Sequence, residues 1–161
     1  MSAPTLVALY DFETQIESAV SAVLTAGGVT VGATARGPEL LATPCVEVVC
    51  NMNGPWPGGN ATRLYNVGGD WRPDQFSASV LVTVLTDRKR NPSSHGTFRG
   101  NVRALLYQFV SKFTGTNLPY LDIMDFTETG SAQAQDDPRG LDATTLSWEV
   151  RFAILPTAWP T

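Results

Sequence analysis

The sequence predicts a single α+β domain over residues 1–161: a mainly antiparallel sheet of about four to five strands with two amphipathic helices packed on one face. Three observations predict this class. Apolar residues recur at helical spacing in two segments. They alternate with polar residues over two long segments, which is typical of strands with one buried face. The segments follow one another in the order helix, strands, helix, strands.

The first helix is expected from Pro4 to Thr25. Proline is favoured in a first helical turn, and Gly27 and Gly28 provide the stop. One face of this helix carries the apolar residues Leu9, Phe12, Ile16, Ala19, Val20 and Val23.

A short strand at residues 29–31 and an interior strand at residues 45–51 are expected next. The second segment is apolar on both faces except at Glu47, which is the pattern of a strand inside a sheet. Cys45 and Cys50 are an odd number of residues apart, so they should lie on opposite faces of this strand and remain unbridged.

Residues 51–74 are expected to form a long loop, because their many glycines and prolines disfavour a helix or a central strand. The loop contains Trp56, Tyr65 and Trp71. Two interpretations stay open at this point. The aromatic residues either pack back on the domain or dock on a neighbouring molecule, where Trp, Tyr and Arg are frequent anchors.

The next strand is expected from Gln75 to Thr86, followed by a basic loop and a second helix over residues 94–113. The apolar stripe of this helix comprises Phe98, Val102, Leu105, Leu106, Phe109, Val110 and Phe113.

Two strands are expected in the C-terminal part, separated by a polar loop. The first covers residues 118–126, and the loop covers residues 127–140, which are rich in Gly, Ser, Gln and Asp. The last strand runs from Leu146 to Leu155, with strict alternation that places Trp148 on its apolar face.

The sequence contains no recognisable catalytic motif, so we expect no enzyme, no cofactor and no metal. His95 is the only histidine, has no acidic neighbour in sequence, and is expected at a helix start in solvent. The aspartates at 122, 125, 136 and 137 do not have the spacing of a calcium loop. No segment approaches the ~20 apolar residues that span a bilayer, so no membrane association is expected.

Charge is distributed unevenly along the chain. Residues 61–110 carry a net charge of about +4, whereas the segments before and after each carry about −4. The cations Arg88, Lys89, Arg90, Arg99 and Arg103 lie in the basic loop and on the second helix, away from its apolar stripe. We rank a subunit interface first, an ordinary solvated face second and nucleic-acid phosphate third. Sequence-specific DNA reading is not expected of an acidic chain without a helix-turn-helix.

In layout, the chain resembles the tail terminators of long-tailed bacteriophages. The resemblance is carried by the long first helix, the basic loop leading into RGNVRALL (residues 99–106), and the final strand ending FAILPTAWP (residues 152–160).

The resemblance implies a ring, commonly a hexamer, that caps the tail tube, ends tube polymerisation and presents a surface to the head. Its partners would be further copies of itself, the tail tube protein and the head–tail connector, with DNA passing through the lumen. The protein would be assembled in the bacterial cytoplasm and located in the virion. The alternatives are another neck component, such as a head-completion or stopper protein, or a monomeric binding module that uses residues 51–74.

Overall fold

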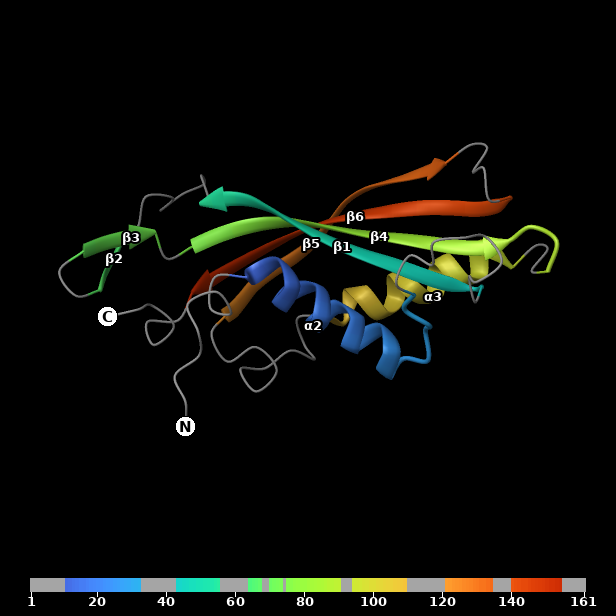
Figure 1. Cartoon of the computed structure of the whole chain (residues 1–161), viewed down its shortest axis with the longest axis horizontal. Helices are drawn as coiled ribbons and strands as arrows, with labels where there is room; N and C mark the ends of the chain where they lie inside the picture. Colours follow the sequence, from blue (N-terminus) through green and yellow to red (C-terminus); the bar gives the residue numbers. More distant parts are fainter. Residues whose placement is uncertain are drawn as a thin grey trace.

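A four-stranded antiparallel sheet with two α-helices confirms the predicted α+β class (Figure 1). This computed structural model describes residues 11–32, 43–55, 64–67, 70–73, 75–90, 94–109, 121–134 and 140–154. Its elements are α2 (Phe12–Ala26), β1 (Cys45–Pro55), β2 (Leu64–Val67), β3 (Asp70–Pro73), β4 (Gln75–Asp87), α3 (His95–Tyr107), β5 (Leu121–Ala134) and β6 (Leu141–Ile154).

The strand order of the main sheet is β1-β4-β6-β5. The two most regular strands, β4 and β6, form its centre and are paired without a shift from Gln75↔Ala153 to Asp87↔Leu141. The pairing of β5 with β6 shifts at Met124 and at Thr129, which are the extra residues of two bulges. Both long alternating segments of the sequence are therefore central strands.

The hydrophobic core lies between the sheet and the helices. Alternate residues of the two central strands are buried in it: Ala78, Val80, Val82 and Val84 of β4, and Leu146, Trp148, Val150 and Phe152 of β6. Val102 and Leu106 of α3 are buried there too. The buried face of α2 comprises Phe12, Ile16, Ala19, Val20, Val23 and Leu24, close to the predicted stripe. In Figure 1 both helices are drawn below the sheet.

Aromatic rings fill the core at both ends. Phe12 of α2 lies near Phe76 and Phe152, with ring centroids 6.3 and 5.8 Å away. Farther along the sheet, Trp148 stacks on Phe126 at 4.7 Å, and Tyr107 meets it edge-on at 4.9 Å. Trp148 is 1% exposed. The prediction that Trp148 lies on the apolar, buried face of the last strand is therefore confirmed.

Helix α2 begins later than the sequence suggested. Asp11 caps it, because its carboxylate accepts a hydrogen bond from the N–H of Thr14 at 3.2 Å. The expected start at Pro4 lies outside the described residues. In α3, Phe98 and Leu105 are partly buried. Helix α3 ends at Tyr107, short of the expected residue 113; Phe109, just beyond it, is fully buried, while Val110 and Phe113 lie outside the described part.

The prediction of a polar loop over residues 127–140 was wrong for its first half. Residues 127–134 continue β5 and pair with β6 as far as Ala134↔Ala143. Their side chains are small or polar because the strand lies at a sheet edge and most of them are exposed. Alternation of apolar residues marks only strands that have a buried face, so this extension gave no signal.

Two further expectations about residues 45–74 were also wrong. β1 is an edge strand rather than an interior one, and it extends to Pro55. Within the expected loop, β2 and β3 form a separate two-stranded sheet, which Figure 1 shows beyond the end of the main sheet. The short segment expected at residues 29–31 makes only an isolated bridge, Val31↔Val46.

The two cysteines form no disulfide with each other and are buried on opposite faces of β1, as expected. Cys50 belongs to the main core, whereas Cys45 packs with Leu85, Leu141 and Ala143 on the other face of the sheet. Burial, together with Glu17 and Glu13, raises the pKa of the Cys50 thiol to about 12. This thiol is therefore unreactive at neutral pH.

Candidate functional site

The predicted basic loop forms a tight turn after β4. The carboxylate Oδ1 of Asp87 accepts hydrogen bonds from the backbone N–H groups of Lys89 and Arg90, at 2.8 and 3.1 Å. These bonds to the ionised form hold the pKa of Asp87 below its usual value. We call Arg88, Lys89 and Arg90 the basic turn; all three side chains are exposed.

The five predicted cations do not form one cluster with one role. Arg88 pairs with Asp142 of β6, with 3.1 Å between Nη2 and Oδ1. Arg103 pairs with Glu128 of β5, with 3.0 Å between Nε and Oε1. Two cations of the basic middle segment are therefore matched within the chain by acids of the C-terminal segment.

Lys89 and Arg90 form no ion pair with any residue that the structure describes. Arg99 is half-buried on the first turns of α3. The cations left available for a partner are thus concentrated at the end of the sheet where β4 stops. Of the predicted aromatic contacts, Trp56 lies outside the described residues, and Tyr65 and Trp71 lie on β2 and β3.

His95 begins α3, as the sequence suggested, but its ring is not in solvent. Its ring is half-buried and joins two strands, with Nδ1 2.8 Å from Thr86 Oγ1 and Nε2 2.8 Å from Thr144 Oγ1. Burial lowers the pKa of His95; Asp142 opposes this shift, and Arg99 adds to it. The ring therefore ties the start of α3 to the sheet in its neutral form.

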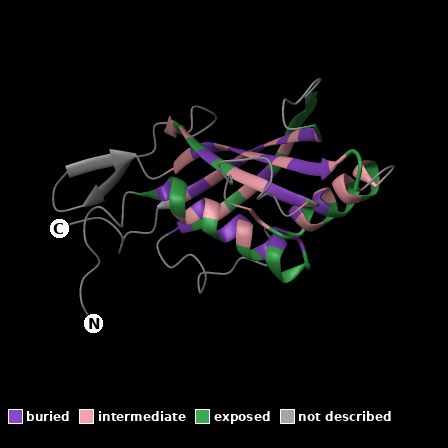
Figure 2. Cartoon of the chain, turned by 45° about the vertical axis from the view of Figure 1, so that its right-hand side comes forward, coloured by how far each residue is buried: buried purple, intermediate pink, exposed green. Residues whose placement is uncertain are grey.

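The sheet face opposite the core is incompletely covered, and we call it the open face. Its central residues are polar or small, apart from Val49 and Leu81, and most are half-exposed, as the mixed colours of the strands in Figure 2 show. Its central rows join Glu47, Val49 and Asn51 of β1, Ser79, Leu81 and Thr83 of β4, and Thr145, Ser147 and Glu149 of β6.

The open face is ordered by its own hydrogen bonds. Thr83 and Thr145 lie opposite each other, with their hydroxyl oxygens 3.0 Å apart. Ser79 donates to the side-chain oxygen of Asn53 at 3.0 Å. Among the described residues of this face, the end that carries Cys45 and Leu85 is buried, and so is Ser77 toward the other end. The centre of the face is therefore a mainly polar surface, and its charged residues in these rows are Glu47 and Glu149.

The edge of the sheet at β1 is covered by side chains of α2, which the sequence did not reveal. Glu17 accepts a hydrogen bond from the N–H of Cys50 at 3.0 Å, and Glu13 accepts one from Met52 at 2.9 Å. Farther along, the N–H of Val46 donates to the carbonyl of Thr30 at 3.0 Å.

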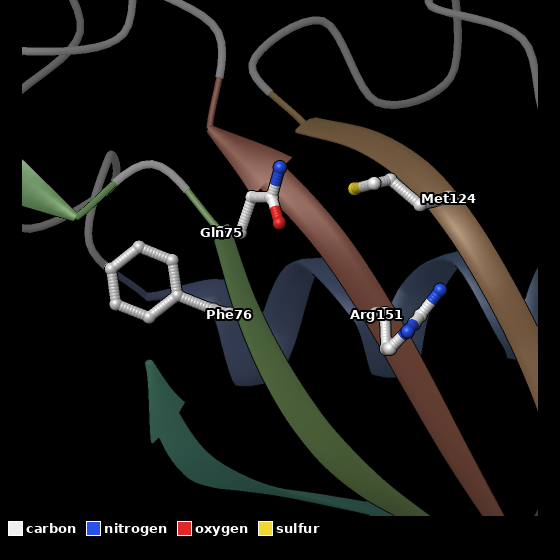
Figure 3. A pocket seen from close by; sticks show the side chains of 4 residues that line it. All are labelled: Gln75, Phe76, Met124 and Arg151. Atoms are coloured by element: carbon white, nitrogen blue, oxygen red, sulfur yellow. The ribbon is translucent and has the colours of Figure 1, made fainter. Parts of the chain in front are cut away.

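No described cavity has the character of an active site. Gln75, Phe76, Met124 and Arg151 line a pocket of about 40 Å³, which holds little more than one water (Figure 3). A wider groove of about 480 Å³ separates the end of α2 from α3, and its lining contains no titratable side chain; Phe98, Leu105 and Asn101 are among its walls.

Within the described ranges, no three His, Cys, Asp or Glu side chains are grouped so that they could hold a metal ion. Among the helices described, none is long and apolar enough to cross a membrane.

Comparison of the sequence with known protein families and with curated proteins finds no match.

Proposed function

We propose that this chain is a structural assembly protein of the neck of a long-tailed bacteriophage. In this proposal it is a tail terminator whose copies form a ring, in the simplest case a hexamer. The ring would cap the tail tube, end its polymerisation and present a surface to the head connector. The resemblance of layout suggests this role, and the arrangement of surfaces supports self-association.

The observation that carries the proposal is the contrast between the two faces of the central strands. In β4, Val80, Val82 and Val84 are fully buried, whereas Leu81 and Thr83 between them are half-exposed. Val49, opposite Leu81, is 45% exposed. A sheet of this size with one face incompletely covered offers a broad surface to another molecule.

Charge at the two ends of the sheet supports contacts between identical copies. The strand registers place Asp87 and the basic turn at one end, in the row Asp87↔Leu141. Asp122 lies in the row of Gln75 and Ala153 at the opposite end. Opposite charges at opposite ends favour head-to-tail contacts, and such contacts close into a ring when their rotation permits.

The test is the assembly of a variant in which Arg88, Lys89 and Arg90 are all changed to Glu. Since these side chains are exposed and lie outside the core, the fold should persist, and the assembled mass in light scattering should be lost. A control variant, Thr97→Glu with Asn101→Glu, adds acidic residues at exposed positions of α3 and should still assemble.

Two results would refute the proposal. One is a wild-type chain that remains at the monomer mass of 17.3 kDa at micromolar concentration, also in the presence of tail tubes. The other is a triple variant that assembles and terminates tubes like the wild type.

A further inference from the structure

The backbone N–H groups of β5 that face away from β6 can be identified from the strand registers. Val46, Cys50 and Met52 of β1 donate outward, away from β4. Hydrogen-bonding direction alternates along an antiparallel strand, so their even-numbered partners in β4 donate toward β6. The odd-numbered residues of β6 then bond β5.

The same alternation shows which N–H groups of β5 face away from β6. Thr127 and Asp125, opposite Glu149 and Arg151, bond to β6. The N–H groups of Phe126 and Glu128 therefore point outward from the sheet. Among the described residues, none accepts a hydrogen bond from either group. Within the described part of the chain, β5 thus presents an open edge, and what fits such an edge is the backbone of another extended strand.

The surroundings of this edge suit a bound strand. Tyr107 is 62% exposed next to Glu128, to which its hydroxyl donates at 2.8 Å. Phe126 is buried beside it, under Trp148. Bulges at Met124 and Thr129 leave a regular stretch of four residues, Asp125–Glu128, between them.

The chain also contains a suitable donor strand. β2 and β3 are four residues each and pair only with each other in the described sheets. A two-stranded hairpin is marginally stable in water, so it gains from joining a larger sheet. β3 ends at Pro73, which has no N–H group, so β2 has the more complete free edge. Its length matches the regular stretch of β5.

We propose that the β2–β3 hairpin of one copy joins the β5 edge of a neighbouring copy through β2. This extends the four-stranded sheet of the neighbour to six strands. The inference rests on the self-association proposed above and names one of its contacts. The contact is heterologous, because the hairpin and the edge are different surfaces. At β1 a competing contact is disfavoured, because the N–H groups of Val46, Cys50 and Met52 already have acceptors within the chain.

The experiment compares Glu128→Pro with Glu128→Ala in the full chain, by light scattering at matched concentrations. Both variants lose the carboxylate that binds Arg103 and Tyr107, but only proline removes the outward N–H. We expect Glu128→Ala to retain the assembled mass and Glu128→Pro to lose it. Circular dichroism checks that both variants are folded.

A second measurement decides the matter if Glu128→Pro fails to fold. In it, residues 64–73 are replaced by a Gly-Ser linker, and amide exchange is followed at Phe126 and Glu128. In the wild type these two amides should exchange more slowly as protein concentration rises, and the replacement should abolish this dependence.

Several outcomes overturn the contact. It fails if Glu128→Pro assembles as Glu128→Ala does, or if Glu128→Ala itself prevents assembly. It also fails if the two amides are protected independently of concentration, since the hairpin would then bind its own β5. If the wild type assembles and the variants assemble equally well, only this contact is overturned. If the wild type stays monomeric, the proposed function is overturned.

Discussion

The two edge strands of the main sheet differ in how their free backbone groups are treated. At β1, the outward N–H groups of Cys50 and Met52 donate to Glu17 and Glu13 of α2, and Val46 donates to Thr30. At β5, the groups of Phe126 and Glu128 have no such acceptor among the described residues. At β1 the chain itself thus satisfies three outward N–H groups, whereas those of Phe126 and Glu128 at β5 stay open among the described residues.

This difference limits how copies of the chain can associate. If both edges were free, sheets could add to one another without limit, as in an aggregating edge strand. Because α2 and Thr30 occupy N–H groups of β1, we expect strands to be added at β5. The added strand must then come from a part of the neighbouring copy other than its sheet edge. Protection of β1 therefore disfavours stacking of sheets edge to edge, and the hairpin contact closes into a ring when its rotation permits.

The largest expected effect concerns the side of the sheet that carries β5. Trp148 is buried between Phe126 and Tyr107, and it holds β5 and α3 together. Trp148→Ala should lower the free energy of unfolding by ~3–5 kcal/mol. Chemical denaturation measures this loss. Tyr107→Ala, at an exposed ring, should cost much less, and equal losses would contradict the packing described.

A smaller effect is expected at the covered edge. Glu17→Ala removes the acceptor of the Cys50 N–H, and we expect a loss of about 1–3 kcal/mol together with increased aggregation. Glu17→Gln keeps a side-chain oxygen at the same position and is the matched control. If Glu17→Ala were as stable and as soluble as Glu17→Gln, the edge would not depend on this contact.

The smallest effect is a pH dependence at the end of the sheet that carries the basic turn. Burial lowers the pKa of His95 below 6.5, so between these two values the unfolded chain binds more protons than the folded one. Stability should therefore decrease as the pH falls below 6.5. The nearby charges are Asp142, which opposes the shift, and Arg99, which adds to it.

The measurement is the unfolding free energy between pH 7.5 and about 5, compared with that of His95→Gln. The variant should show a weaker dependence on pH in this window. A wild-type curve that is flat, or that rises toward acid, would show that His95 is not held in its neutral form.

Patterns with one buried face could be predicted from the sequence. The alternation in β4 and β6 and the helical stripes of α2 and α3 identified the central strands, the helices and the buried position of Trp148. These features depend on a simple division between apolar and polar faces, which local sequence records directly.

Edges and long-range polar contacts could not be predicted in this way. Residues 127–134 lack alternation because they are exposed, and the β2–β3 hairpin is hidden in a segment rich in glycine and proline. The contact of Glu17 with Cys50 spans 33 residues. The same holds for His95 and Thr144, which are 49 residues apart. Their meeting depends on strand order, which no local pattern contains.

The most direct test of the central claim, that copies of the chain associate in a closed ring, is negative-stain electron microscopy of the purified protein. A closed ring should appear as uniform annular particles with a central opening, and these particles should be lost in the triple variant of the basic turn. Fields that contain only 17.3 kDa monomers, or open fibres of indefinite length, would contradict it.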